Sequence, residues 1–376
     1  MEATAGAVTR VAALTLRGFR GYENVRVVLG SGLTVVSGPN GAGKTNLLEA
    51  IYFGSTGRSC RTTNEREVVR FGSDAARVVV QVVGEDGPHE LSVGFTPGEP
   101  KRMRVDGASV ERLLDASARP LVSVFLPDRL ELIKGPPAVR RAHLDQLVAA
   151  LWPSRVATRR AYAQTLAQRN ALIARIRAGS GSRASLASWN AQLARYGMDL
   201  MADRSEAVAV VAGRFQVLAE ALGLGADCAL TYRPRSRAQQ PDELAAELSE
   251  RSDVDLDRGF TSHGPHRDEL ALKRADREVR TYGSQGQQRL ALLSLLLAER
   301  DAVADRRGAL PLLLLDDVMS ELDHDRRLAL VEWLRSGRGQ AVITTTDLEH
   351  VPGAASPEVT RIAVSDGRVL QEAVAA

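Results

Sequence analysis

The stretch LTVVSGPNGAGKTNLLEAIY, residues 33–52, decides the fold of this chain. LTVVS is typical of a buried strand and TNLLEAIY of a helix, and the loop between them fills the pattern G-x-x-x-x-G-K-[ST]. Glycines let the backbone N–H groups of such a loop surround phosphate oxygens, and the N-terminus of the following helix adds positive potential. The stretch therefore predicts a P-loop, with these nucleotide-binding residues: Gly38, Pro39, Asn40, Gly41, Ala42, Gly43, Lys44 and Thr45.

Two side chains of this loop have distinct expected roles. Lys44 is predicted to reach the β and γ phosphates and to act in catalysis, and the Thr45 hydroxyl is predicted to bind Mg²⁺. Lys44 also stands out because 45 of the 49 basic residues are arginine, so a lysine here indicates a need for a compact ammonium. An ordinary glycine turn that caps a helix is the alternative, and the specificity of the pattern disfavours it.

A second segment supplies an acidic partner for the magnesium ion. ALPLLLLDDVMSELD, residues 309–323, is a strand-length apolar run that ends in two aspartates. The carboxyl ends of strands are where ligands of open α/β sheets bind. We therefore expect Asp316 to bind Mg²⁺, directly or through water, and Asp317 to polarise the attacking water. A strand followed by a helix with an Asp or Ser cap is the alternative, and the presence of the P-loop weakens it.

The composition limits the class of protein. The 376 residues, 44% of them hydrophobic, allow a large core and two domains. Cys60 and Cys228 provide neither a disulfide framework nor a metal-ligand spacing, which favours a reducing compartment. The N-terminal stretch MEATAGAVTRVAALTLRGFR lacks a basic start followed by an apolar core, and no apolar run approaches about eighteen residues. We therefore predict a cytoplasmic protein without a membrane span.

The spacing of the two nucleotide-site segments predicts the domain organisation. They lie about 270 residues apart, although both must contact one nucleotide. The head is therefore predicted to combine residues 1–136, which hold the P-loop and an antiparallel layer of short strands, with residues 260–376. Residues 137–259 have a mostly helical pattern, and they are predicted to be a compact helical arm inserted between the two halves.

A third segment, YGSQGQQRLALLSLLLAER at residues 282–300, joins a glycine–glutamine cluster to a leucine run. The leucine run predicts a helix that is apolar on all sides and is therefore buried. Taken alone, Ser284 would simply cap this helix, and the glutamines would be solvated.

Several segments together resemble a known family. LLLLDD and SELD resemble the Walker B motif and D-loop of ATP-binding-cassette ATPases, and SQGQQR at residues 284–289 resembles their signature motif as the RecF family carries it. LRGFRGYENVRVVL, GRSCRT, FLPDRLELIKGPPAVRRAHLD, GPHRDEL and ITTTD resemble the same family, in order, along nearly the whole chain. The resemblance implies an α/β fold: an ATP-binding-cassette P-loop head with a mixed sheet and an antiparallel β layer, plus an inserted compact helical arm.

The resemblance also implies a mechanism. In ATPases of this type the signature completes the ATP site of a second subunit, so ATP and Mg²⁺ would join two heads into an ATP-dependent homodimer. The residues expected to meet the partner's γ-phosphate are Ser284, Gln285, Gly286 and Gln287. The family further implies binding to duplex DNA and to gapped single-strand/double-strand junctions, and joint action with RecR and RecO to help load RecA. This role in DNA replication and recombinational repair rests on the resemblance alone.

Two groups of arginines are candidates for DNA contacts. Residues 137–197 contain ten arginines against one acid, a net charge of +9 that is typical of a surface neutralising phosphates. A solvated helix surface is the alternative, and a helical wheel gives no clean basic face. A second group follows the P-loop helix. The candidates are Arg155, Arg159, Arg169 and Arg177 in the arm and Arg58, Arg61, Arg66 and Arg70 in the head.

Departures from transporter-type cassettes bear on the rate of hydrolysis. Asp317 is one methylene shorter than the usual glutamate, and Thr344, Thr345, Thr346 and Asp347 stand where transporters place a histidine. We predict slow hydrolysis, because a shorter base holds the attacking water less well. Asp128, in the loop after LVSVFL, is a candidate sensor of the γ-phosphate.

Three other classes remain as alternatives. The nucleotide-binding subunit of a transporter would carry LSGGQ where this chain has GSQGQ, and it would have no basic arm. A chromosome-structuring clamp would carry a long coiled coil, for which an insertion of about 120 residues is too short. A phosphotransferase with a P-loop leaves the signature and the insertion unexplained.

Overall fold

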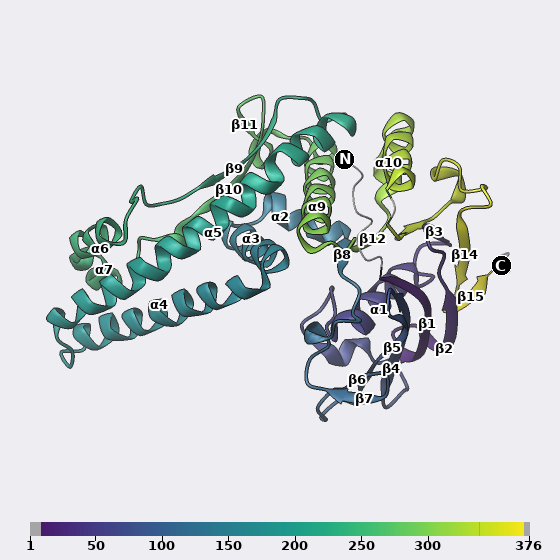
Figure 1. Ribbon diagram of the computed structural model, residues 1–376, viewed down its shortest axis with the longest axis horizontal. Coiled ribbons are helices and arrows are strands. Elements are labelled where there is room, and N and C mark those ends of the chain that lie inside the picture. Colours follow the sequence, from purple (N-terminus) through teal and green to yellow (C-terminus); the bar gives the residue numbers. More distant parts are fainter. Residues whose placement is uncertain (1–8, 338, 372–376) are drawn as a thin grey trace. The chain divides into compact units, whose positions relative to one another are not determined.

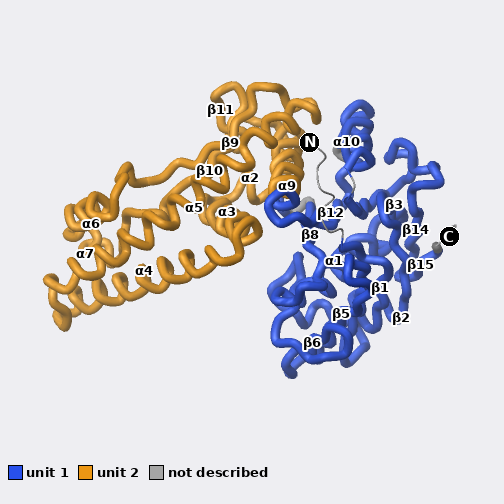
Figure 2. Tube along the Cα trace, viewed as in Figure 1, with its two compact units in different colours: residues 1–129, 303–376 blue, residues 130–302 orange. Residues whose placement is uncertain are grey.

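The chain leaves its first unit at residue 129 and returns to it at residue 303. In the computed structural model, which describes residues 9–337 and 339–371, the first unit is built from the described parts of residues 1–129 and 303–376, and the second from residues 130–302 (Figure 2). Figure 1 labels the elements of both units. The first eight residues of the N-terminal stretch considered above lie outside the described ranges.

A six-stranded mixed sheet forms one layer of the first unit. Its strands are β3 (Leu33–Ser37), β8 (Val122–Phe125), β12 (Leu312–Leu315), β13 (Ala341–Thr345), β14 (Thr360–Ser365) and β15 (Arg368–Gln371). Their order is β15-β14-β3-β13-β12-β8, with β15 antiparallel to β14 and every other neighbouring pair parallel. The predicted strand LTVVS is β3. It lies between β14 and β13 in the sheet, and its apolar side chains are buried on both faces.

An antiparallel sheet forms the second layer. Its strands are β1 (Arg10–Phe19), β2 (Tyr22–Val28), β4 (Ala76–Gly84), β5 (Gly87–Phe95), β6 (Arg102–Val105) and β7 (Ala108–Val110), in the order β2-β1-β4-β5-β6-β7. Alternate valines of β4 are buried, as the period of two along a strand requires when one face of the sheet covers a core. This layer contains most of the short alternating strands that the sequence predicts between residues 76 and 125.

The P-loop helix α1 (Lys44–Thr56) packs against strands of both sheets (Figure 1). Its apolar side chains, among them Leu48 and Phe53, are fully buried in one core with residues of both sheets. Gly54 allows this close approach, because a Cβ there would lie 2.3 Å from a methyl group of Val80. The other helices of this unit are α10 (His324–Ser336) and the 3₁₀ segments η1 (Glu65–Val68), η2 (Leu113–Asp115), η3 (Pro127–Leu130), η7 (Val318–Glu321) and η8 (Leu348–His350).

The second unit is mostly helical. Its helices are α2 (Glu131–Lys134), α3 (Pro137–Leu151), α4 (Val156–Arg177), α5 (Leu186–Ala221), α6 (Pro241–Glu250), α7 (Ser252–Arg258), α8 (Val279–Tyr282) and most of α9 (Gln285–Arg307), with 3₁₀ turns η4 (Pro153–Arg155), η5 (Arg183–Ser185) and η6 (Pro265–Arg267). Residues 303–307 of α9 belong to the first unit. Helices α4 and α5 pack side by side as a hairpin (Figure 1). A small antiparallel sheet of order β11-β10-β9 joins β9 (Cys228–Arg233), β10 (Glu269–Arg274) and β11 (Arg277–Glu278).

The division between the units differs from the predicted arm boundaries of residues 137–259. Residues 260–302 belong to the second unit because β10 pairs with β9, and because Glu269 forms a bidentate ion pair with Arg140 on α3. The local sequence pattern did not indicate this strand pairing or this ion pair. Within the described ranges, none of the helices combines the length and apolar character that a bilayer crossing requires.

Candidate nucleotide-binding site

Three neighbouring parallel strands bring the predicted nucleotide-site residues to one edge of the mixed sheet. Strands β3, β13 and β12 are adjacent, and all three run in the same direction. The P-loop follows β3, Asp316 and Asp317 follow β12, and Thr344 and Thr345 end β13. Segments that are about 270 residues apart in the sequence therefore meet at the carboxyl edge of the sheet, which is where such sheets bind ligands.

The backbone of the P-loop depends on two glycines. Gly38 has a φ of 157° and a Cβ there would lie 2.1 Å from the carbonyl oxygen of Val364. Gly43 has a φ of 113° directly before α1, and it accepts a hydrogen bond from the Tyr22 hydroxyl at 2.9 Å. No side chain in the described part of the chain caps the start of α1, so its first N–H groups are available for an anion.

The Lys44 side chain folds back over the loop. Its ammonium donates hydrogen bonds to the carbonyl oxygens of Gly38 at 2.7 Å and Pro39 at 3.0 Å. Burial lowers the pKa of this lysine, and the nearby charges of Asp317 and Asp316 oppose the shift. The two carboxylates therefore help to keep the buried ammonium charged beside the position that phosphates would take.

Asp316 is held by two threonine hydroxyls. Thr45 donates to its two carboxylate oxygens at 3.0 and 2.9 Å, and Thr344 donates to Oδ1 at 2.6 Å. Burial raises the pKa of Asp316, and the two hydroxyl hydrogen bonds act in the opposite direction. The sequence predicted Thr45 and Asp316 but left Thr344 without a role. Its position at the end of a strand next to the aspartate strand was the available signal.

Asp317 occupies an unusual backbone conformation. Its φ is 48°, in the left-handed region that few non-glycine residues adopt, and its backbone N–H donates to the Thr344 hydroxyl at 2.9 Å. Its Oδ1 is enclosed and has no hydrogen-bond partner among the described residues. A strained residue with an unsatisfied carboxylate oxygen is typical of a functional site.

These residues line a pocket of about 290 Å³ in the first unit. A hydroxyl and a carboxylate 2.9 Å apart are hard oxygen donors, which is the donor set that Mg²⁺ prefers when nucleotide phosphates complete its coordination. Among the described residues there is no cluster of three or more His, Cys, Asp or Glu side chains able to hold a metal. The lining residues are Asn40, Gly41, Gly43, Lys44, Thr45, Asn46, Arg61, Asp316 and Asp317.

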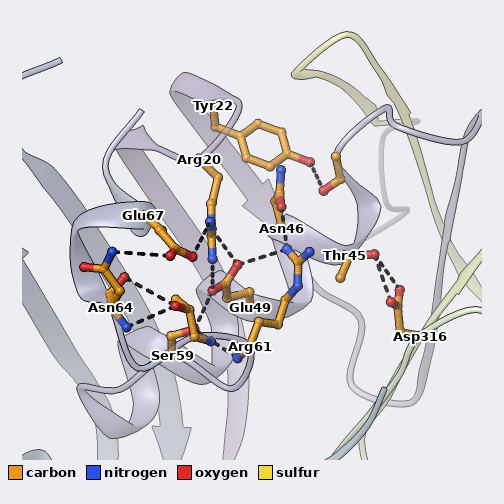
Figure 3. A network of polar contacts seen from close by, with 12 residues as sticks. Arg20, Tyr22, Thr45, Asn46, Glu49, Ser59, Arg61, Asn64, Glu67 and Asp316 are labelled. Carbon is orange, nitrogen blue, oxygen red and sulfur yellow. Dashed lines mark hydrogen bonds and ion pairs between the residues drawn. The ribbon is translucent and has the colours of Figure 1, made fainter. Parts of the chain in front are cut away.

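Figure 3 shows a polar network that connects this pocket to the segment after α1. Arg61 borders the pocket and donates to Asn46 at 3.0 Å and to the fully buried Glu49 at 3.3 Å. Glu49 also receives a bidentate pair from Arg20 and a hydrogen bond from Ser59. Arg61, predicted to contact DNA, therefore lies beside the nucleotide pocket, and no local sequence pattern indicated that Glu49 would organise this network.

The signature segment forms the start of α9 in the second unit. The Ser284 hydroxyl accepts the Gln287 backbone N–H at 3.3 Å, and the Gln287 side chain accepts the Ser284 N–H at 2.9 Å. This reciprocal pair is a capping box. Ser284, Gln285 and Gly286 are exposed, whereas the leucines from Leu290 onward are buried.

The arginine candidates divide into several groups. The prediction that Arg169 contacts DNA is wrong, because its side chain is 0% exposed and binds Asp255 at 2.7 Å inside the second unit. Arg155 pairs with Asp203 and Glu206 and stacks on Trp152, and Arg159 pairs with Asp145 while remaining 57% exposed. Four other candidates lie outside the pocket. Arg58, Arg66 and Arg177 are exposed, whereas the guanidinium group of Arg70 lies 3.7 Å from the carboxylate of Glu23.

Two further residues noted in the sequence, Asp128 and Asp347, lie in loops. The side chain of Asp128, the candidate γ-phosphate sensor, lies outside the described residues. Asp347 caps the 3₁₀ segment η8 by accepting the Glu349 N–H at 3.0 Å, and Thr345 bonds the Asp347 backbone. These contacts are local and structural.

The phosphate-binding loop after β3, the aspartates after β12 and the capped glutamine-rich start of α9 define a P-loop ATPase of the ATP-binding-cassette class. A protein-family model described as "RecF/RecN/SMC N terminal domain" matches residues 10–369. The DNA replication and repair protein RecF of Myxococcus xanthus is 37% identical over 371 residues, covering 96% of this chain and 97% of that protein. The RecF of Streptomyces avermitilis is 35% identical, covering 95% and 98%.

Solved structures agree with this assignment. The recombination mediator protein RecF-ATP in the RecFOR pathway is 26% identical, with a TM-score of 0.82 and 99% of each chain covered. The Smc head domain from Pyrococcus furiosus, 16% identical with a TM-score of 0.58 over 98% of this chain and 97% of that one, is similar in fold alone. The chain belongs to the RecF family. The predicted family and the predicted α/β cassette-head fold are confirmed.

Proposed function

We propose that this protein is an ATP-dependent DNA-binding protein that acts in DNA replication and recombinational gap repair. Support comes from relatives that are named DNA replication and repair protein RecF and that match this chain over 97% and 98% of their own length. The observation that carries the proposal is the pocket at the edge of the mixed sheet, where Lys44, Thr45 and Asp316 converge. Its cofactors would be ATP and Mg²⁺.

The pocket residues have separate proposed roles. The N–H groups of residues 38–45 and the Lys44 ammonium would bind the phosphates, and Thr45 with Asp316 would hold Mg²⁺. The ion would neutralise developing charge on the phosphates. Asp317 would orient the attacking water, in keeping with its unsatisfied Oδ1. We further propose that hydrolysis is slow, because the short Asp317 side chain holds water less firmly than a glutamate. A turnover of several per second without DNA would contradict this.

The signature would act on a second copy of the chain. Ser284 and the following N–H groups are exposed at the start of a 23-residue helix, so they present a positive helix end to solvent. We propose that Ser284, Gln285, Gly286 and Gln287 meet the γ-phosphate bound by a partner, and that ATP thereby joins two heads. Dimerisation then becomes a switch that hydrolysis resets.

The proposed DNA ligand is a duplex or a gapped single-strand/double-strand junction. Among the residues first considered, Arg58, Arg66, Arg159 and Arg177 remain exposed enough to contact phosphates. The name of the solved relative places that protein in the RecFOR pathway, which supports RecR and RecO as proposed partners. The proposal adds RecA as the protein that they help to load. A cytoplasmic location follows from these partners.

The test measures dimerisation and binding to gapped DNA with ATP, with ADP and without nucleotide. Dimers and tight DNA binding are expected only with ATP. Lys44→Met and Ser284→Arg should each strongly weaken the ATP-dependent dimer, although they alter different parts of the chain. Dimers that form without ATP, together with unchanged DNA binding in both variants, would contradict the proposal.

A further inference from the structure

The antiparallel sheet of the first unit has one face on the core and one face toward solvent. Helix α1 packs against β1, β4 and β5 (Figure 1). Val78 and Val80 of β4 are fully buried in the core that also holds the apolar side chains of α1. Because side chains alternate along a strand, Arg77, Val79 and Gln81 lie on the opposite face, where Arg77 and Gln81 are exposed. We call this opposite face of the sheet the outer face.

The strand register places five arginines on the outer face in two rows. The first row consists of Arg17 of β1, Arg77 of β4, Gly94 of β5 and Arg102 of β6, each paired with the next. The second row, two residues along the strands, consists of Arg26 of β2, Thr15 of β1, Val79 of β4, Ser92 of β5 and Arg104 of β6. Residues paired in this way point to the same face of a sheet, and all five arginines are exposed.

Much of the positive charge on the outer face has no acidic partner. Arg102 pairs with Glu99 at 2.9 Å between nitrogen and oxygen. For Arg17, Arg77 and Arg104, the residues that the structure describes offer no carboxylate within ion-pair distance. Arg17 and Arg77 also stand directly opposite each other, and like charges in such a pair destabilise a sheet. This arrangement favours the binding of an anion from outside the chain.

Acidic side chains gather at one end of the sheet instead of among the arginines. Glu90 and Asp106 lie beyond the second row, and Asp86 lies in the turn between β4 and β5. The carboxylates of Asp86 and Asp106 contact the His89 ring at 3.1 and 2.7 Å. A polyanion would therefore be attracted over the arginine rows and repelled at the acidic end, which limits where it can lie.

The spread of the arginines matches the spacing of the two backbones of a DNA duplex. Neighbouring strands lie about 4.8 Å apart, so the four spacings from β2 to β6 make the array about 19 Å wide. The two rows are about 7 Å apart along the strands. The major groove of B-DNA is about 12 Å wide. Arginines at the two ends of the rows can therefore reach phosphates on both backbones that border one groove.

The surroundings of the arginines are polar. Between them the rows carry Thr15, Ser92 and Gly94, and the single valine, Val79, is half-buried. Protein–protein interfaces have an apolar centre rich in aromatic side chains, whereas protein–DNA interfaces are more polar and much more positive. Gly94 also leaves the centre of the first row without a side chain, and the nearest atoms to a Cβ built there are 3.9 Å away. The outer face therefore fits a phosphate backbone better than an acidic protein surface.

We propose that the outer face of the antiparallel sheet binds the phosphate backbone of duplex DNA, with Arg17, Arg77 and Arg104 as the central contacts. Guanidinium forks match phosphate oxygens, and charge-assisted hydrogen bonds to phosphate are among the strong ones. The inference rests on the proposed DNA-binding function and deepens it, because it assigns the duplex to a surface that includes none of the arginines considered from the sequence.

The test measures binding of the full-length protein with ATP to a blunt DNA duplex, by fluorescence anisotropy at a series of salt concentrations. The double variant Arg17→Gln/Arg77→Gln removes two adjacent charges. The slope of log affinity against log salt should fall in magnitude by about 1.8, which is about 0.9 for each phosphate contact. At about 0.1 M salt this corresponds to roughly 60-fold weaker binding. The thermal unfolding midpoint should stay the same or rise, because the substitutions relieve a like-charge pair.

Two controls separate contact with DNA from other effects of the substitutions. Arg335→Gln removes one charge from a 38% exposed arginine of α10, which pairs with Glu358, and it should match the wild type in slope and affinity. Arg17→Lys/Arg77→Lys keeps both charges without the guanidinium forks, so it should keep the slope while losing some affinity. Should Arg17→Gln/Arg77→Gln unfold, Arg104→Gln carries the same comparison, with an expected fall in slope of about 0.9.

The remaining outcomes identify which proposal fails. If the wild type does not bind duplex or gapped DNA with ATP, the proposed function fails and this inference fails with it. If the wild type binds and the glutamine variants match it in slope, only this inference fails. A second arm replaces the duplex by poly-L-glutamate. Weaker binding of that probe by the glutamine variants, with an unchanged DNA slope, would overturn the inference in favour of an acidic protein partner.

Discussion

The nucleotide pocket and the signature segment differ in how their polar groups are satisfied. In the pocket, Asp316 receives hydrogen bonds from Thr45 and Thr344, which lie far away in the sequence, and its surroundings are buried. In the signature, the side chains of Ser284 and Gln287 each accept the backbone N–H of the other residue, three positions apart, with Ser284 exposed and Gln287 half-buried. Tertiary contacts therefore hold the polar groups of the pocket, whereas local contacts at the start of one helix hold those of the signature. This difference fits a pocket that works within its chain and a signature that needs an external ligand.

The largest effect that tests this difference is expected from Lys44→Met. Methionine fills the space of the lysine stem but offers no charge to the phosphates, so ATP hydrolysis should fall about a thousandfold, toward the upper end seen when a transition-state donor is removed. Steady-state phosphate release measures this. Lys134→Met, which changes an exposed lysine at the end of α2, is the matched control and should keep full activity. Normal hydrolysis in Lys44→Met would remove the pocket from the mechanism.

Arg169→Met is expected to have the next largest effect, on stability. Arg169 and Asp255 are both 0% exposed, and the substitution leaves the carboxylate buried without its cation. The free energy of unfolding should fall by about 3–5 kcal/mol. Denaturant unfolding followed by circular dichroism measures the loss. Arg183→Met breaks an ion pair to Asp253 in which both side chains are mostly exposed, and should cost less than about 1 kcal/mol.

Arg169 also shows which features of the structure could not be predicted from the sequence. The P-loop was predictable because its chemistry lies in eight consecutive residues, and the apolar strands were predictable from local patterns. Arg169 and Arg159 look alike in the sequence, yet one is buried against Asp255, 86 residues away, and the other is exposed. Thr344 and Glu49 likewise acquire their partners only through tertiary contacts. Local patterns therefore located the strands that carry the candidate site residues but not the groups that orient those residues.

Ser284→Arg tests the same difference between the two regions by changing the signature segment. A bulky cation at an exposed helix start should block a partner's γ-phosphate, so the ATP-dependent dimer is expected to weaken about a hundredfold, a loss of roughly 2.7 kcal/mol. Sedimentation velocity with ATP measures it, and nucleotide binding by the monomer should persist. Ser182→Arg is the matched control, because Ser182 is an exposed serine before η5. Equal loss of nucleotide binding in Ser284→Arg would contradict a role in trans.

The smallest of these effects is expected from Thr344→Val, which removes a hydroxyl while keeping the shape of the side chain. The hydroxyl donates to Asp316 and accepts the N–H of Asp317, so its loss loosens the orientation of both acids at once. Hydrolysis should fall about tenfold, with a higher Mg²⁺ concentration needed for half-maximal rate, because second-shell partners typically contribute about 10–100-fold to metal affinity or activity. Thr346→Val, one residue past the end of β13, should leave both quantities unchanged. If Thr344→Val matches the wild type in rate and in Mg²⁺ dependence, the pocket does not depend on tertiary positioning of its acids, and its contrast with the signature is lost.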